Sequence, residues 1–193
     1  MRIILGSQSP RRKEILSQFN IPFTQASSNF DEESIPFSGD PGNFACKLAE
    51  CKEKTLRPAY PKSAILTADT IVYCDNKLYG KPATEKEACR MFAELQGRWH
   101  SVFTGVALSY EDQLFSQYEE SRVLFNHLSP NQIKAYHRTS NWSDKAGGYG
   151  IQAGGGLLIK KIDGCFYNVM GLPVNTVRDL FNKIGIDLWD YLK

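Results

Sequence analysis

Apolar and polar positions along the first third of the chain switch repeatedly between strand and helix spacing. A short apolar run at residues 2–6 breaks into a polar turn, and residues 10–19 then have helical spacing. Residues 23–27 predict a second strand. After a polar loop, Asp40 and the proline that follows it are typical of a helix start, and an apolar stripe predicts a helix over 41–56.

The most strand-like run of the chain covers residues 64–73, and it is apolar almost throughout. This pattern predicts a strand that is buried on both faces. Residues 78–82 are expected to leave the sheet, and a capping box at Thr84 and Glu87 predicts a helix through residue 95. The elements expected after it are a hairpin of strands 101–110 and 114–125, a helix over 129–138, a glycine-rich loop over 144–156, a strand over 157–162 and a helix over 174–184.

Strands and helices alternate at both ends of the chain while a hairpin lies in the middle, which predicts an α/β fold with a mixed sheet. The 193 residues, 42% of them hydrophobic, are enough for one domain or two tightly joined lobes. No repeat, low-complexity segment or clear linker divides the sequence. We therefore expect residues 1–193 to form a single domain.

The small net charge and the lack of targeting signals limit the partners and the location that we expect for the protein. The 23 basic and 21 acidic residues leave a formal charge of +2, too little to recruit duplex nucleic acid or an anionic membrane. No run approaches the ~20 apolar residues of a membrane span, and the first residues lack the apolar core of a secretory signal. We expect a cytoplasmic protein without a nucleic-acid or membrane partner. The five cysteines contain no C-x-x-C pair, so reduced, mostly buried thiols are expected rather than a zinc site.

The first candidate for chemistry is the turn between the first strand and the first helix. Ser7, Ser9, Arg11 and Arg12 surround a helix N-terminus, where backbone N–H groups, hydroxyls and guanidinium groups suit an anion, above all a phosphate chain. The alternative is structural, because Ser9 and the following proline also make a good helix cap and arginines often face solvent.

Several catalytic motifs are missing from the sequence. There is no G-x-x-x-x-G-K-[ST] or G-x-S-x-G pattern, and the near match from Gly148 to Ala153 neither follows a strand nor opens a helix. No Cys–His pair is indicated. Covalent nucleophilic catalysis is therefore disfavoured.

Charged residues at or near the ends of the expected elements remain, namely Asp31, Glu32, Lys52, Asp69 and Lys81. A carboxylate in a buried strand must be paired or bind a cation, which makes Asp69 the strongest candidate. Together with Glu32 it offers the oxygen ligands that Mg²⁺ or Mn²⁺ prefers. The alternatives are a structural ion pair or turn for Asp69, and solvated surface positions for Lys52 and Lys81.

One residue of the glycine-rich segment is suited to recognise a nucleotide base through hydrogen bonds. The side-chain amide of Gln152 offers an acceptor and a donor that complement N3–H and O4 of uracil or thymine, and the glycines allow a ligand to approach the backbone. The alternative is a flexible surface loop.

Together these residues resemble the Maf family of nucleoside triphosphate pyrophosphatases, a group related in fold to the inosine triphosphate pyrophosphatases. The resemblance covers essentially the whole chain and is carried by five ordered motifs: LGSQSPRR at 5–12, ADT at 68–70, GKP at 80–82, DKAGGYGIQ at 144–152 and VMGLP at 169–173. It implies an elongated mixed sheet flanked by helices, with two lobes and a cleft. It also implies hydrolysis of a nucleoside triphosphate to the monophosphate and pyrophosphate with a divalent cation.

The resemblance assigns roles to individual residues. Asp69 matches the proton acceptor proposed for the family. The residues that match the phosphate and metal surroundings are Ser7, Arg12, Glu32, Lys52 and Lys81. With Asp69 as base and Lys52 and Lys81 beside it, the family mechanism implies attack of water on the α-phosphorus.

Positions linked to substrate choice in the family match Arg12, Thr70 and Gln152, and YGIQ at 149–152 is similar to the branch that acts on dTTP and UTP. The sister branch acts on 7-methyl-GTP and usually carries Ser–Glu in place of the Ile–Gln of this chain. The chain departs from the family at Gly6, where alanine is commoner, and at Ala153, where a glycine usually follows the glutamine. We expect Gly6 to be harmless and Ala153 to affect the base side of the site.

Three functions stay open at the level of sequence. The first is hydrolysis of dTTP, UTP and modified pyrimidine nucleotides, the second is hydrolysis of 7-methyl-GTP, and the third is nucleotide binding without turnover by a regulator of cell division. The presence of every acidic and basic position of the site favours an enzyme over a binder. The sequence leaves open whether the chain forms a homodimer.

Overall fold

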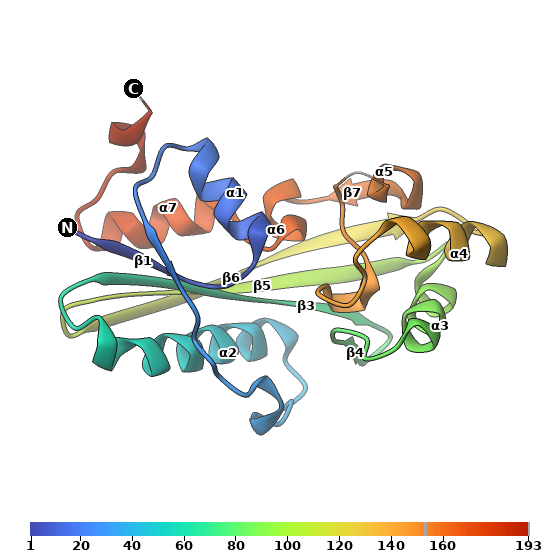
Figure 1. The fold of residues 1–193 in the computed structure, drawn as a ribbon, viewed down its shortest axis with the longest axis horizontal. Helices are drawn as coiled ribbons and strands as arrows, with labels where there is room; N and C mark the ends of the chain where they lie inside the picture. The colour runs from blue at the N-terminus through green and yellow to red at the C-terminus, as the bar shows by residue number, and fades with distance from the viewer. Residues whose placement is uncertain (153, 193) are drawn as a thin grey trace.

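The computed structural model describes residues 1–152 and 154–192, which fold around one long sheet (Figure 1). The strands are β1 (Ile3–Gly6), β2 (Thr24–Ala26), β3 (Ala64–Cys74), β4 (Lys77–Tyr79), β5 (Trp99–Tyr110), β6 (Gln113–Phe125) and β7 (Ile159–Asp163). The α-helices are α1 (Pro10–Gln18), α2 (Pro41–Leu56), α3 (Glu85–Leu95), α4 (Pro130–Thr139), α5 (Gly155–Leu158), α6 (Phe166–Met170) and α7 (Val174–Lys183). A 3₁₀ turn, η1 (Glu32–Ser34), precedes α2.

The sheet mixes parallel and antiparallel pairs, as the sequence predicted. Its order is β2-β1-β3-β5-β6-β7, with β4 paired to β3. β1 runs parallel to β2 and β3, whereas the pairs β3–β5, β5–β6 and β6–β7 are antiparallel. The predicted α/β class and the predicted hairpin of β5 and β6 are therefore confirmed.

Helices cover both faces of the long strands (Figure 1). Helix α2 lies along one face, and α1, α6 and α7 lie on the other face near β1. Helices α3 and α4 cover the far end, where Phe92 and Phe125 belong to a second hydrophobic cluster. The first cluster joins β1, α1 and α7 and includes the fully buried Phe181. The core thus consists of several clusters spread along an elongated sheet, which leaves room for a site between them.

The residues expected to start helices do so in the structure. The Ser9 hydroxyl accepts a hydrogen bond from the backbone N–H of Arg12, and the Thr84 hydroxyl accepts one from the N–H of Glu87 at 3.2 Å. The Glu87 carboxylate accepts from the N–H of Ala83 at 2.9 Å rather than from Thr84, so the predicted capping box is shifted by one residue. Caps are local interactions, which is why sequence predicts them well.

Two segments differ from the sequence prediction. Residues 78–82 were expected to leave the sheet, but Leu78 belongs to β4, because Asp75 and Asn76 take positive φ values of 48° and 60° and make a tight hairpin turn. Residues 157 and 158 were expected to begin a strand, but they end α5. That helical turn buries Leu158 among aromatic side chains and leaves Leu157 81% exposed, an arrangement that a short apolar run does not specify.

The cysteines are free, and two of the five, Cys46 and Cys74, are buried while the others are half-buried. The expectation of mostly buried thiols is therefore only partly met. Within residues 1–152 and 154–192, no helix combines the length and the apolar character needed to cross a membrane.

Candidate active site

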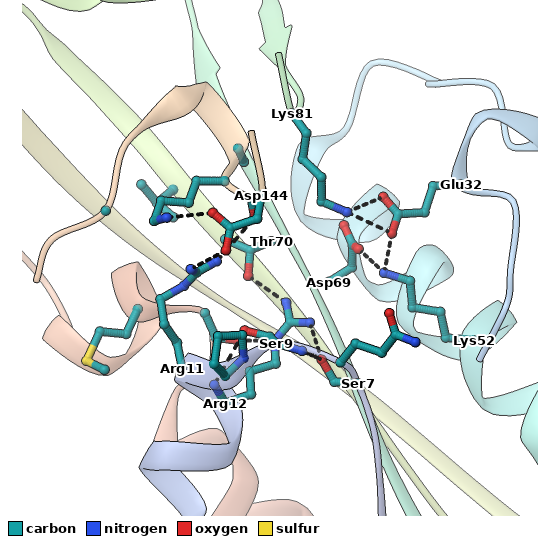
Figure 2. Close-up of a pocket in the computed structure, with 18 of the residues that line it drawn as sticks. Ser7, Ser9, Arg11, Arg12, Glu32, Lys52, Asp69, Thr70, Lys81 and Asp144 are labelled. Carbon is teal, nitrogen blue, oxygen red and sulfur yellow. Dashed lines mark hydrogen bonds and ion pairs between the residues drawn. The ribbon is translucent and has the colours of Figure 1, made fainter. Parts of the chain in front are cut away.

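A pocket with a volume of about 510 Å³ opens beside the middle of β3. Its walls come from the β1–α1 turn, the segment around η1, α2, β3 and the stretch from residue 144 to 151. Figure 2 shows the charged side chains that converge there from these distant parts of the sequence. The predicted site residues that line the pocket are Ser7, Arg11, Arg12, Glu32, Lys52, Asp69, Thr70 and Lys81. Asp31 is not part of the lining and instead caps η1.

Two carboxylates and two lysines form a connected cluster on one side of the pocket (Figure 2). Lys52 donates a hydrogen bond to Asp69, and its Nζ lies 2.8 Å from Oε1 of Glu32. Lys81 Nζ lies 3.2 Å from the same Glu32 oxygen. Lys52 and Asp69 are only 7% and 5% exposed, so the solvated alternative is wrong for Lys52. Lys81 is exposed but paired.

The electrostatic environment shifts the pKa values of the two carboxyl groups in opposite directions. Burial raises the pKa of Asp69, and Glu32 raises it further, against the opposing effect of Lys52. Burial also acts to raise the pKa of Glu32, but Lys52 and Lys81 outweigh it and lower the pKa. A buried carboxylate with a raised pKa, next to an ionised one, is the arrangement expected of a proton acceptor beside an electrostatic partner.

Arg12 lines the pocket, and its guanidinium donates hydrogen bonds to three residues. Its Nη1 donates to the Ser7 hydroxyl and its Nη2 to the Thr70 hydroxyl, each at 3.1 Å. Its Nε donates to the backbone carbonyl of Gly171 at 2.7 Å. Gly171 has a φ of 105°, a left-handed conformation that suits glycine, and a Cβ there would lie 3.2 Å from the Thr70 hydroxyl. The guanidinium therefore has a fixed position close to Asp69.

Asp144 and Lys145 were not predicted to be site residues, yet both line the pocket. Arg11 lies in the pocket as predicted, but it forms an ion pair with Asp144 at 3.0 Å instead of standing free. The signal was present in the DKAGGYGIQ motif, where two opposite charges open a glycine-rich segment. Only the fold shows that this motif contacts α1.

The glycine-rich segment is not a solvated loop at its centre. Gly147 and Gly148 are buried with φ values of 67° and 73°, and Tyr149 is 5% exposed. Gln152 lies apart from the pocket lining, and its amide donates to Oε2 of Glu14 at 3.1 Å. Its contact with a base remains a prediction, and the departure at residue 153 lies outside the described residues.

The carboxylates of the pocket decide whether it can hold a divalent cation. Among the described residues, no group of three or more His, Cys, Asp or Glu side chains converges as a ligand set. Glu32 and Asp69 nevertheless both contact Lys52 Nζ, so their carboxylates lie close together. Mg²⁺ is commonly held by one or two carboxylates, with water and substrate phosphates completing its shell. These two residues therefore fit Mg²⁺ or Mn²⁺.

A Cys–His pair, which the sequence did not indicate, lies outside this pocket. The Sγ of Cys89 on α3 is 3.2 Å from Nδ1 of His137 on α4, a contact between residues far apart in sequence. Burial raises the pKa of Cys89 and lowers the pKa of His137. Both groups are therefore held neutral, and the thiol is not activated as a nucleophile.

Comparison with known proteins agrees with the motifs. A family model described as "Maf-like protein" matches residues 2–184. A protein of Chlamydia caviae named "dTTP/UTP pyrophosphatase" is 44% identical over 99% of this chain and 98% of its own length. One of Chlamydia muridarum named "Nucleoside triphosphate pyrophosphatase" is 41% identical over the same shares. Among solved structures, a HAM1 protein from Coxiella burnetii aligns with a TM-score of 0.46 and 16% identity over 65% of this chain and 73% of that chain.

Proposed function

Because the chain belongs to the Maf family, we propose that it hydrolyses dTTP, UTP and modified pyrimidine nucleoside triphosphates to the monophosphate and pyrophosphate, with the help of Mg²⁺ or Mn²⁺. Support comes from relatives that are at least 41% identical over nearly their full length and are named as pyrophosphatases of this kind. The observation that carries the proposal is the buried Asp69, held by Lys52 beside Arg12 and Glu32.

In this mechanism Asp69 accepts a proton from the water that attacks the α-phosphorus. Its raised pKa strengthens it as a base, and Lys52 fixes one of its two carboxylate oxygens. Glu32 and Asp69 would hold the cation, which when bound neutralises charge on the phosphate oxygens. Asp69 would thus be both the proton acceptor and a ligand of the cation, because it lies at the centre of the charged cluster.

The basic residues act on the phosphate chain. Arg12 is fixed by Ser7 and Thr70, so its charge is in place before the substrate arrives. Lys52 and Lys81, which both pair with Glu32, would stabilise the charge that builds up on the leaving pyrophosphate. Ser7 adds a hydroxyl near the start of α1, where phosphate oxygens are favourably bound.

A product assay tests this function directly. Purified protein is incubated with dTTP, UTP, CTP, ITP or 7-methyl-GTP, with Mg²⁺, with Mn²⁺ or with a chelator, and pyrophosphate is measured separately from orthophosphate. We expect pyrophosphate and monophosphate from dTTP and UTP, and none with the chelator. A preference for 7-methyl-GTP would contradict the pyrimidine assignment, and nucleotide binding without any product would favour a regulator.

A further inference from the structure

Arg11 is held by the residue that opens the glycine-rich segment. Its Nη1 donates to Oδ2 of Asp144 at 3.0 Å, and its Nη2 donates to the backbone carbonyl oxygen of the same residue at 3.2 Å. The two side chains are 18% and 35% exposed, so the contact is partly shielded from water. A guanidinium that binds both the side chain and the backbone of one residue fixes its position and its orientation.

Asp144 is held from a second side as well. Lys145 Nζ lies 2.5 Å from Oδ1, so each carboxylate oxygen has its own cation. Burial would raise the pKa of Asp144, but the hydrogen bonds from Lys145 and Arg11 lower it, and the group stays ionised. Figure 2 shows Asp144 and Arg11 across the pocket from Lys52, with Thr70 between the two sides.

The residues that follow Asp144 form one wall of the pocket, and other elements hold that wall. The hydroxyl of Tyr149 is 2.7 Å from Nε2 of His100 on β5. The hydroxyl of Tyr136 on α4 accepts a hydrogen bond from the N–H of Gly150 at 3.1 Å. The far end of the wall is thus tied to β5 and α4, and the ion pair at its near end ties it to α1.

We propose that Asp144 is a positioning residue for the nucleotide. Through Arg11 it sets the spacing between the start of α1, where the phosphates would bind, and the wall of residues 144–151. This proposal rests on the proposed function. A carboxylate repels a triphosphate, so any benefit of Asp144 to binding must come from geometry rather than from direct attraction. Without the Asp144 carboxylate only the backbone carbonyl of residue 144 still accepts from Arg11, so the tie between the wall and α1 weakens and Arg11 is freer to turn toward the phosphates. Affinity for the nucleoside part then falls, whereas affinity for a bare polyphosphate does not.

The test compares a nucleotide with a ligand that has no base or sugar. Binding of α,β-imido-dUTP and of tripolyphosphate is measured by calorimetry for the wild type, Asp144→Asn and the charge-matched control Asp112→Asn, which lies in the exposed β5–β6 turn. We expect Asp144→Asn to weaken nucleotide binding about tenfold, the loss of one charged hydrogen bond, and to keep tripolyphosphate within about twofold or tighter. Asp112→Asn should change neither. Equal weakening of both ligands, or unchanged nucleotide affinity, would overturn the proposal.

A second variant and a kinetic measurement separate positioning from folding. Arg11→Lys keeps the charge but lacks the planar guanidinium that makes both hydrogen bonds, so it should change binding in the same way as Asp144→Asn. A tenfold loss of tripolyphosphate affinity in this variant would instead make Arg11 a phosphate ligand and overturn the proposal. For dTTP, we expect Asp144→Asn to raise KM about tenfold and to change kcat less than about threefold. If the wild type binds the analogue but releases no pyrophosphate from dTTP, the proposed function fails while the binding comparison still tests Asp144.

Discussion

Asp69 combines two properties that are rarely found together, because it is 5% exposed and yet surrounded by charge. It lies opposite Gly105 in the β3–β5 register, at the centre of the longest strands. The rigid sheet therefore fixes its backbone, and Lys52 fixes its side chain. A carboxylate held in this way needs little reorganisation to take a proton from water, the role that we propose for it.

Replacing Asp69 by asparagine keeps the shape of the side chain and removes the proposed base. We expect kcat for dTTP to fall at least about 100-fold, as for loss of a general base. Thermal unfolding should show that the variant is folded, and Asp163→Asn, an exposed aspartate on β7, serves as control. A kcat within about threefold of wild type would rule out Asp69 as the proton acceptor.

His100 makes stability depend on pH. It is 3% exposed, and burial lowers its pKa to about 4 from an ordinary 6.5. The folded state favours the neutral ring, so the contribution of His100 to stability is complete above pH 6.5 and is lost as the pH falls toward 4. From these values, the free energy of unfolding should drop by about 2 kcal/mol between pH 7 and pH 5.

Urea unfolding of wild type and His100→Gln at both pH values checks this expectation. The glutamine can still bond to Tyr149 but does not titrate, so its unfolding free energy should fall by about 2 kcal/mol less than that of the wild type over the same range. Equal pH dependence of the two proteins would show that His100 is not the group responsible.

At the scale of elements, α2 lies directly against β5. A Cβ added at Gly105 would lie 2.2 Å from the backbone carbon of Ala45, so the helix backbone leaves no space for a side chain there. This close approach brings Lys52, which lies further along α2, to Asp69 on the neighbouring strand. Packing of one helix thus determines the geometry of the charged cluster.

Gly105→Ala should therefore force α2 away from the sheet and destabilise the protein by about 3 kcal/mol. Gly156→Ala is the matched control, because a Cβ there meets nothing within 4 Å, and it should change stability by less than about 0.5 kcal/mol. Urea unfolding measures both. A Gly105→Ala variant as stable as the control would mean that α2 can shift at little cost.

How far the sequence could predict these elements depends on how local their causes are. Helix starts such as Ser9 depend on neighbours within one turn, and they were predicted correctly. The burial of Lys52 could not be predicted, because its position off the apolar stripe of α2 is typical of a solvated lysine and only the contact with β3 buries it. The tie between Arg11 and Asp144 spans 133 residues and has no periodic signal at all.

At the scale of the whole molecule, charge is distributed unevenly. The pocket is lined by five cationic side chains and three carboxylates, a surplus of two positive charges that equals the formal charge of the entire chain. The remaining surface is balanced overall. A protein without a strong global field can thus attract a triphosphate locally, since a cleft lined by one net sign of charge focuses the potential.

This distribution predicts how nucleotide binding responds to salt. Raising ionic strength from about 0.05 M to about 0.5 M shortens the screening length from more than 10 Å to less than 5 Å, so KM for dTTP should rise several-fold at fixed free Mg²⁺ while kcat changes little. Lys81→Gln removes a pocket charge and should flatten this dependence. Lys86→Gln removes another exposed lysine, one that does not line the pocket, and should not. If KM for dTTP depends on salt as strongly in both variants as in the wild type, the attraction of the nucleotide is not local to the pocket. The net charge of the molecule must then account for it.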